Sequence, residues 1–222
     1  MNKIKIKEIF ESIQGEGPFV GYNQLFIRFC NCNLNCNYCD TEYTSQKDFI
    51  EYTAEDLLDE IKKYPNIHSI SLTGGEPLLS AKFLKEILPL VNKKIYLETN
   101  ATLADELSEI KDYVDIISAD IKLESSTGLK NMFQMHDTFF KNCDGIKTFA
   151  KIVFNDKITD FEIITSCNLA KKYNLELILQ PEMKGNSFSV DTEFSAGIFY
   201  KFLDNYDNIR LIPQVHKFLN VR

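Results

Sequence analysis

Residues 25–41 read LFIRFCNCNLNCNYCDT, an apolar stretch followed at once by a loop that carries Cys32, Cys36 and Cys39. The spacing C-x3-C-x2-C places three thiols on one short loop, enough to hold a four-iron cluster by three of its irons. A cluster that only transfers electrons normally takes all its ligands from protein thiolates, whereas an iron without a cysteine can bind a small molecule. The stretch therefore predicts a reactive iron–sulfur site directly after a strand.

Two other uses of these cysteines stay open at this point. Cys30 lies in the same run, so four nearby thiolates could close a tetrahedral zinc site, although such sites usually use two separated short pairs. A disulfide framework is weaker still, because the chain has 6 cysteines in 222 residues and starts with the polar segment MNKIKIKE. These features predict a reduced, cytoplasmic protein, with Cys30, Cys143 and Cys167 as small core residues.

The composition fits one compact enzyme domain that spans residues 1–222. The formal net charge is -7 and the pI is about 5.1. These values argue against direct nucleic-acid binding, which depends on clustered Lys and Arg. No apolar run approaches the roughly twenty residues that span a bilayer, so no membrane contact is expected.

Apolar, β-branched runs alternate with stretches of helical period along the chain. The predicted strands are residues 25–29, 69–73, 94–99, 114–120, 149–154, 175–180 and 209–214. The predicted helices lie within residues 53–64, 80–91, 103–113, 159–173 and 192–206, with Thr53, Ser80 and Thr159 as N-caps. This order indicates an α/β fold with a mainly parallel sheet, and fewer than eight clear units favour an open, partial β/α barrel.

A second motif, Thr73-Gly74-Gly75-Glu76-Pro77, follows the predicted strand 69–73. Carboxyl ends of parallel strands form the active rim of such folds, and glycine lets the backbone approach a ligand that a Cβ would exclude. A Gly-Gly turn alone is more often a tight strand-to-helix connection. Beside the cysteine loop, it indicates a turn whose carbonyls accept from an ammonium group.

Together these motifs resemble the radical S-adenosylmethionine superfamily. SIQGEG (12–17), FIR (26–28), CDT (39–41) and IPQVHK (212–217) resemble, more narrowly, the 7-carboxy-7-deazaguanine synthases, over nearly the full length. The resemblance implies a partial barrel of the radical S-adenosylmethionine type with a [4Fe-4S] cluster, S-adenosylmethionine and Mg2+. The implied reaction contracts the ring of 6-carboxy-5,6,7,8-tetrahydropterin and releases ammonia, giving 7-carboxy-7-deazaguanine for queuosine-type tRNA modification.

The resemblance also implies roles for individual residues. Cluster ligands would be Cys32, Cys36 and Cys39, and Thr41 would bind Mg2+. Residues expected to bind S-adenosylmethionine are Tyr38, Asp40, Gly74, Gly75, Glu76, Thr99, Asp120, Ile121, Lys122 and Gln180. Residues expected to bind the substrate are Ile13, Gln14, Gly15, Arg28, Thr73, His216 and Arg222, and the catalytic set is Glu16, Arg28 and His216.

Plainer roles stand beside these. Arg28 could belong to an ion pair and Lys122 to a salt bridge at the rim, and a lone histidine such as His216 is more often structural. For Arg28, the planar guanidinium suits bidentate binding of the substrate carboxylate. Glu98 and Asn100 follow another strand and are candidates to orient the cofactor or to tune proton transfer.

Two positions depart from the family pattern. Asn31 stands where glycine usually precedes the first cluster cysteine, and Asn tolerates left-handed φ better than most residues. Ala101 stands where glycine is frequent, and it would cost about 1 kcal/mol if the position needs positive φ. The segment DIKLESS also differs from the commoner SPK form, which bears on Asp120 and Ile121.

The resemblance implies a flavodoxin or ferredoxin as reductant and a homodimer as the assembly. The cluster loop is placed at residues 30–45, and the C-terminal segment that closes the substrate pocket at 208–222. Two other classes remain as alternatives. One is a glycyl-radical activating enzyme, which acts on a protein backbone, and the other is a zinc module without enzymatic activity.

Overall fold

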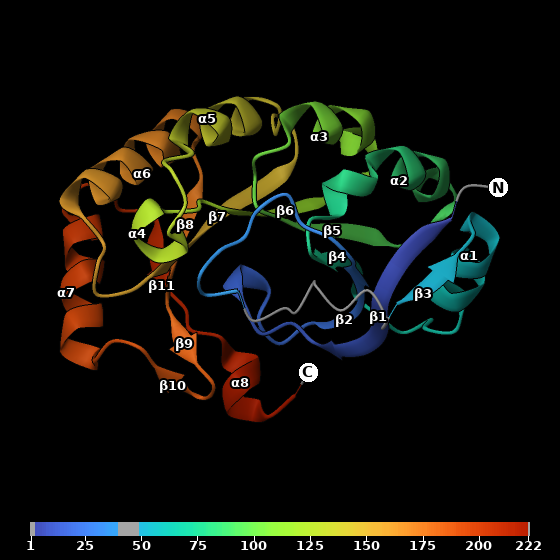
Figure 1. Cartoon of the computed structure of the whole chain (residues 1–222), viewed down its shortest axis with the longest axis horizontal. Helices are drawn as coiled ribbons and strands as arrows, with labels where there is room; N and C mark the ends of the chain where they lie inside the picture. The colour runs from blue at the N-terminus through green and yellow to red at the C-terminus, as the bar shows by residue number, and fades with distance from the viewer. Residues whose placement is uncertain (1–2, 40–48, 222) are drawn as a thin grey trace.

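A computed structural model describes residues 3–39 and 49–221 of the chain. Its main sheet has nine strands in the order β11-β8-β7-β6-β5-β4-β2-β1-β3. Strands from β2 to β11 along this order pair in parallel, whereas β1 pairs antiparallel with both β2 and β3. Within the described residues β11 and β3 are the two edges, so the sheet is an open partial barrel (Figure 1).

The strands of this sheet are β1 (Ile4–Ile13), β2 (Asn23–Phe29), β3 (Ile50–Tyr52), β4 (Ser69–Gly74), β5 (Lys94–Thr99), β6 (Ile116–Asp120), β7 (Lys147–Phe154), β8 (Glu176–Pro181) and β11 (Ile209–Leu211). A separate hairpin consists of β9 (Met183–Lys184) and β10 (Ser187–Phe188). The helices are α1 (Ala54–Lys62), α2 (Ala81–Ile87), α3 (Ala104–Ile110), α4 (Glu124–Thr127), α5 (Phe133–Lys141), α6 (Asp160–Tyr173), α7 (Thr192–Leu203) and α8 (Val215–Leu219). Short 3-10 turns are η1 (Gly17–Phe19), η2 (Pro77–Ser80), η3 (Leu88–Leu90) and η4 (Lys111–Tyr113).

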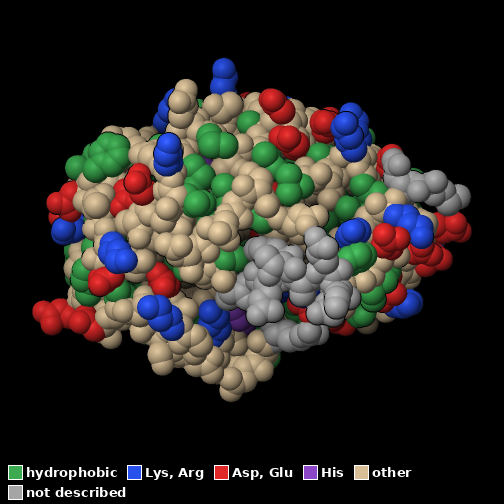
Figure 2. All heavy atoms as spheres, in the orientation of Figure 1, with side chains coloured by type: hydrophobic (Ala, Val, Ile, Leu, Met, Phe, Trp, Pro, Cys, Tyr) green, Lys and Arg blue, Asp and Glu red, His purple; other side chains and the backbone are tan. Residues whose placement is uncertain are grey.

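Helices α2, α3, α5, α6 and α7 lie along the outer, convex side of the sheet (Figure 1). Every second residue of a strand faces these helices and belongs to the main core. Examples are Ile70 and Leu72 of β4 and Ala150 and Ile152 of β7. No helix in the described residues is long and apolar enough to cross a membrane. Acidic and basic side chains are interspersed over the face drawn in Figure 2, unlike the continuous basic surface of a nucleic-acid-binding protein.

The other strand residues point to the concave side, and there the sequence changes character along each strand. At the amino ends, Tyr96, Ile116, Phe149 and Ile178 form a second buried cluster with Phe19 of η1. The Phe19 and Tyr96 rings meet edge to face, with centroids 5.4 Å apart. This cluster fills the floor of the barrel with apolar side chains.

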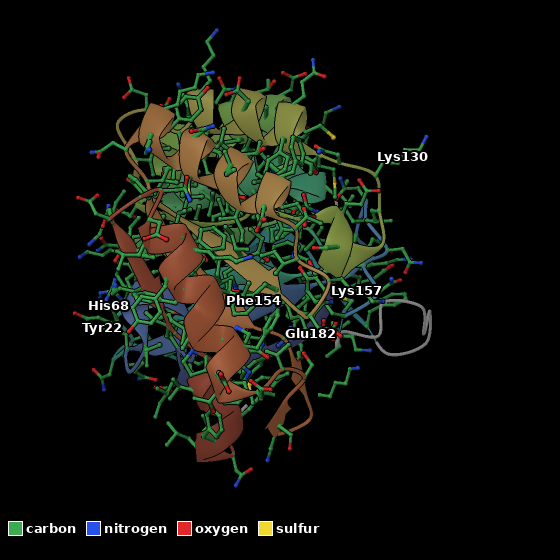
Figure 3. The ribbon with its side chains drawn as sticks, turned by 90° about the vertical axis from the view of Figure 1, so that its left-hand side faces the viewer. Tyr22, His68, Lys130, Phe154, Lys157 and Glu182 are labelled. Carbon is green, nitrogen blue, oxygen red and sulfur yellow. The ribbon has the colours of Figure 1, made fainter. Side chains whose placement is uncertain are left out.

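Toward the carboxyl ends, the concave positions become polar instead. They are Arg28, Thr73, Glu98, Asp120, Lys151 and Gln180 on successive strands, and all of them line one cavity. Figure 3 shows both ends of the sheet, with Tyr22 and His68 at the amino ends and Lys157 and Glu182 at the carboxyl ends. The period of two in each strand thus builds a polar rim above an apolar floor.

The expectations from sequence for this architecture are largely confirmed. All seven predicted strands and all five predicted helices are present, and Thr53 and Thr159 form capping boxes with Asp56 and Glu162. The expected cap at Ser80 is wrong, because its side chain makes no capping bond. The chain instead enters α2 through η2, whose first turn is capped by the carboxylate of Glu76.

Four strands and three helices of the structure were not expected from the sequence. No strand or helix was predicted for the segments that form β1, β3, β9, β10, α4, α5 and α8, and the predicted strand 209–214 is longer than the observed one. The closing strand is β11, and it ends at Leu211. His216 is the second residue of the short helix α8, which follows β11 after a short connection.

Candidate active site

One cavity of about 520 Å3 opens at the carboxyl ends of the strands. Its lining includes Cys32, Cys36 and Cys39, together with the polar rim of the sheet and His216 from α8. The thiol loop and the polar rim therefore face the same space, as the α/β pattern and the position of the cysteines predict.

The Gly-Gly turn is the support on which the cluster loop rests. Gly75 N donates to Phe29 O at 3.0 Å, and Glu76 N donates to Asn31 O at 2.8 Å. A Cβ on Gly75 would lie 1.6 Å from Asn31 O, so no other residue fits without moving the loop. Asn31 has a φ of 67°, which explains why Asn can replace glycine there. The turn needs glycine because the backbone of the cluster loop packs against it.

A polar network ties the same loop to the segment after β5. Asn100 Nδ2 donates to Asn33 Oδ1 at 2.7 Å and lies 3.7 Å from Cys32 Sγ. Asn33 Nδ2 in turn donates to Thr102 Oγ1 at 2.9 Å. The segment turns at Ala101, whose φ of 55° lies in the left-handed region where glycine was expected. Asn100 thus positions the first cysteine from the neighbouring strand end.

The outer side of the loop packs on α4. Asn37 N donates to Thr127 O at 2.9 Å, and a Cβ on Gly128 would lie 2.3 Å from Asn37 Nδ2. Gly128 ends α4 in the left-handed conformation. The cysteine loop is therefore fixed on three sides, by the turn after β4, by the segment after β5 and by α4.

The environment of two of the thiols, those of Cys32 and Cys36, favours their protonated form. Burial raises the pKa of Cys32 and of Cys36, and the nearby Lys122 ammonium partly offsets this rise for Cys36. Thiolates are the form that binds iron, so loading this loop releases protons. Loading should therefore be more favourable at higher pH.

Glu76 lies beneath the turn and does not line the cavity. Its carboxylate accepts hydrogen bonds from Leu78 N, Thr99 Oγ1 and Asn100 N at 2.8–3.1 Å. Burial raises its pKa to about 7, in spite of these donors. The side chain therefore holds the ends of β4 and β5 together, and only its backbone belongs to the turn.

The side of the cavity next to the cluster loop centres on Lys122. Its Nζ donates to Tyr38 Oη at 2.9 Å and to Asp120 Oδ2 at 2.7 Å. Burial alone would lower the pKa of Lys122, but Asp120 and Tyr38 raise it well above its ordinary value. Burial raises the pKa of Tyr38 to about 12, so the phenol stays neutral. This arrangement fixes the aromatic ring beside two of the cysteines.

His136 holds the strand ends behind this group. Its Nε2 accepts from Lys122 N at 3.0 Å, so its Nδ1 carries the proton and donates to Ala101 O at 3.1 Å. The side chain is fully buried, and burial lowers its pKa to about 4. His136 is therefore a neutral bridge between the segments after β5 and β6, a role that its sequence context did not suggest.

On the opposite side, Arg28 pairs with β1. Its Nε donates to Glu8 Oε1 at 2.8 Å, and its guanidinium lies 5.7 Å from the centroid of the Phe10 ring. The ion pair suggested as the plainer role is thus present. A guanidinium has five N–H donors, so pairing through Nε is compatible with a second carboxylate partner in the cavity.

Glu98 collects the donors at the centre of the wall. Its Oε1 accepts from Gln14 Nε2 at 3.0 Å and from Ser71 Oγ at 2.9 Å, and its Oε2 accepts from Thr73 Oγ1 at 3.1 Å. The side chain of Gln14 also donates to Gln24 and accepts from Glu16 N. Gln14 therefore orients Glu98 from within the wall.

Glu16 joins the two ends of the chain. Its Oε1 accepts from Gln214 Nε2 at 2.6 Å, and its Oε2 pairs with the Nζ of Lys151. Burial alone would raise the pKa of Glu16, but the Lys151 ammonium and the hydrogen bonds lower it to about 2. Val215 N donates to Gly15 O at 2.8 Å, and a Cβ on Gly15 would overlap His216. Gly15 is required where α8 closes on the first turn.

Two buried acceptors of the rim have no hydrogen-bond partner among the described residues, Asp120 Oδ1 and Gln180 Oε1. Lys151 Nζ lies 3.4 Å from Asp120 Oδ1, which is an ion-pair distance without hydrogen-bond geometry. Buried acceptors normally find donors. Both side chains line the cavity, so they fit a ligand with hydroxyl or amino donors, such as a nucleoside.

The thiols fit a cluster for a different reason. Among the residues that the structure describes, no three cysteine, histidine or acidic side chains converge as the ligands of one ion do. Thiolates of a four-iron cluster bind different irons of one cube, so they need to share a loop and a cavity wall rather than a point. Cys32, Cys36 and Cys39 meet that requirement.

The structure brings most of the predicted site residues together. Those that line the cavity are Ile13, Gln14, Gly15, Glu16, Arg28, Cys32, Cys36, Tyr38, Cys39, Thr73, Gly74, Gly75, Thr99, Asp120, Lys122, Gln180 and His216. Glu76 and Ile121 lie just behind its wall, and Asp40, Thr41 and Arg222 lie outside the described residues. Lys151 and Ser71 were not among the predicted site residues, although both are polar residues at alternate positions of apolar strands.

Comparison with known proteins agrees with this geometry. Residues 26–170 match the model of the radical SAM superfamily. The fold resembles QueE from Escherichia coli, with a TM-score of 0.65 at 20% identity over 96% of this chain and 95% of that one. A radical SAM methyltransferase from Sphaerobacter thermophilus gives a TM-score of 0.63 at 10% identity, over 92% of this chain and 77% of that one. Fold and thiol loop thus define a radical S-adenosylmethionine enzyme.

Full-length relatives narrow the class. A 7-carboxy-7-deazaguanine synthase from Archaeoglobus fulgidus is 39% identical over 97% of both chains. A second, from Geobacter sulfurreducens, is 32% identical over 97% of this chain and 96% of that protein. The chain therefore belongs to the family of 7-carboxy-7-deazaguanine synthases.

Proposed function

We propose that the chain contracts the ring of 6-carboxy-5,6,7,8-tetrahydropterin and releases ammonia, giving 7-carboxy-7-deazaguanine. The observation that carries this proposal is that the three thiols share one cavity with Arg28, Glu98 and Glu16. Arg28 suits the substrate carboxylate, and the two acidic side chains suit the N–H donors of a pterin. The names of the full-length relatives support the same reaction.

The residues divide into a substrate side and a cofactor side. On the substrate side, Arg28 binds the substrate carboxylate. The Thr73 hydroxyl donates its hydrogen to Glu98, so the hydroxyl oxygen of Thr73 can accept a hydrogen bond from the substrate. The backbone of residues 13–15 and His216 border the same space. The carboxylate of Glu16 is held ionised and can accept a hydrogen bond from an N–H group of the pterin.

On the cofactor side, Cys32, Cys36 and Cys39 would hold the [4Fe-4S] cluster. Tyr38, Asp120, Lys122 and Gln180 would bind the nucleoside, with Asp40, Gly74, Gly75, Glu76, Thr99 and Ile121 completing the site. Mg2+ would bind at Thr41. When bound, the cluster and S-adenosylmethionine supply the abstraction of a hydrogen atom from the substrate.

Further partners follow from this activity. A one-electron donor of the flavodoxin or ferredoxin class would reduce the cluster, and two copies of the chain would form a homodimer. The enzyme would act in the cytoplasm, and its product would feed queuosine-type modification of tRNA. The comparisons with known proteins do not favour a glycyl-radical activating enzyme.

Anaerobic turnover tests the proposal. Reconstituted protein is reduced and incubated with the carboxytetrahydropterin, S-adenosylmethionine and Mg2+, and ammonia and 7-carboxy-7-deazaguanine are quantified. We expect equal amounts of both products and many turnovers for each S-adenosylmethionine. The variant Cys36→Ala is the matched control and should form neither. Cleavage of S-adenosylmethionine without either product would refute the proposal.

A further inference from the structure

Lys151 is a buried lysine in the wall of the cavity that neither a motif nor the family resemblance singles out. It lies in the middle of β7, in the apolar run FAKIVF, and its side chain is 7% exposed. The alternation of β7 turns it to the concave side, above Phe149 of the apolar floor. In the parallel register of β6 and β7 it pairs with Asp120. A buried ammonium in such a strand needs partners to be tolerated.

Its partners come from both sides of the cavity. The Nζ of Lys151 pairs with Glu16 Oε2, and it lies 3.4 Å from Asp120 Oδ1. Glu98 is a third acidic group close enough to raise the pKa of Lys151, together with Asp120 and Glu16. These interactions outweigh burial, which alone would lower that pKa. Lys151 is thus a permanent cation among three acidic side chains.

The two carboxylates closest to Lys151, those of Glu16 and Asp120, belong to different parts of the proposed site. Glu16 accepts from Gln214 beside α8, on the substrate side. Asp120 accepts from Lys122, which also binds Tyr38 on the cofactor side. We propose that Lys151 is a positioning residue, which holds Glu16 and Asp120 in place across the cavity and so sets the substrate against the cofactor. This inference rests on the proposed function.

The two carboxylates depend on Lys151 to different degrees. Asp120 keeps its bond to Lys122 when Lys151 is removed. Among the described residues, the Glu16 carboxylate keeps the hydrogen bond from the Gln214 amide and the weaker influence of His216, while the other acidic neighbours of Lys151, Asp120 and Glu98, remain. Removing one partner of a buried ion pair leaves an uncompensated charge. Loss of Lys151 should therefore act mainly through Glu16.

The direction of the pH effect follows from this. With Lys151 present, the pKa of Glu16 is about 2, and the carboxylate is ionised over the working range. Without the ammonium, burial raises the pKa of Glu16 and so favours its protonated form. The acid limb of the activity profile should then move to higher pH. A role of Lys151 in folding alone would lower activity without moving this limb.

The test compares Lys151→Met, Lys151→Arg, Glu16→Gln and the double variant Lys151→Met/Glu16→Gln in the full-length chain. Lys147→Met is the control, because Lys147 lies on the same strand but is exposed. The kcat and KM for the pterin are measured across pH, and the melting of the protein without cofactors is measured at the same pH values. The double variant removes one positive and one negative charge and leaves no unpaired buried charge at this pair. It should therefore stay folded under conditions that unfold Lys151→Met.

We expect Lys151→Met to lose about 100-fold in kcat/KM at neutral pH, with its acid limb shifted upward. Lys151→Arg should recover part of the loss, and the double variant should be no worse than Glu16→Gln. Activity of Lys151→Met equal to that of Lys147→Met would overturn the inference, as would losses that multiply in the double variant.

Melting separates this inference from the proposed function, because it needs no turnover. Rescue of the melting temperature of Lys151→Met by Glu16→Gln supports the pairing even if the wild-type chain forms no deazaguanine. Additive destabilisation overturns it even if the wild-type chain is active. The two proposals can therefore fail separately.

Discussion

A methyl group at Gly75 should displace the cluster loop. An alanine Cβ at this position would lie 1.6 Å from Asn31 O and 2.4 Å from Asn31 C, and both are backbone atoms that cannot rotate away. Overpacking of this kind costs about 1–3 kcal/mol. The bond from Glu76 N to Asn31 O would be lost as well, at about 1 kcal/mol. Together we expect about 3 kcal/mol of lost stability, or a fall in Tm of roughly 6–12 °C.

Circular dichroism melting and iron content after anaerobic reconstitution measure this prediction. Gly75→Ala should melt earlier and bind less than half of the wild-type iron, because the displaced loop carries Cys32. Gly197→Ala is the matched control, since a Cβ at Gly197 of α7 meets nothing within 4 Å and alanine favours helix. Wild-type melting and full iron loading of Gly75→Ala would refute the argument that the loop rests on this turn.

Three further predictions concern the residues around the rim. Burial lowers the pKa of His136 from 6.5 to about 4, so the unfolded chain binds more protons between these pH values. The free energy of unfolding should therefore fall by about 3 kcal/mol as the pH drops through this window. Urea unfolding at several pH values should show this fall for the wild type and not for His136→Gln. The same pH slope in both proteins would contradict the prediction. Ala101→Gly relieves a φ of 55° and should raise stability by up to about 1 kcal/mol, whereas Ala150→Gly in β7 should lower it, as thermal melting can show; equal destabilisation would count against strain at Ala101. Glu98→Gln replaces one acceptor oxygen with an NH2 group, although Glu98 accepts from three donors. The variant should lower kcat/KM for ammonia release by about 10- to 100-fold, whereas Glu109→Gln on α3 should leave it unchanged. Full activity of Glu98→Gln would exclude Glu98 from the site.

The open α/β architecture could be predicted because each parallel strand is an apolar run and because α1, α2, α3, α6 and α7 lie in stretches of helical period. β1 was not predicted because its segment KIKIKEIF is not a continuous apolar run. Its apolar residues alternate with lysine and glutamate, as is typical of an antiparallel strand near a sheet edge. The helix α8 was not predicted because its five residues are too few to show a helical period.

The site was predictable where a residue belongs to a contiguous motif, as the cysteines and the Gly-Gly turn do. The physical role of a motif was harder to predict. The glycines fit the backbone of the cluster loop, and Glu76 holds strand ends from below the cavity. Lys151 and His136 were missed because their partners come from distant segments, and only the strand register brings Lys151 beside Asp120.

Mössbauer spectroscopy of 57Fe-reconstituted protein tests the central claim most directly, that three thiolates of one loop leave an iron open to this cavity. The account predicts a [4Fe-4S] cluster in which one of the four irons changes its spectrum when S-adenosylmethionine is added. A protein that binds no such cluster, or a cluster whose irons all stay unchanged by S-adenosylmethionine, would contradict it.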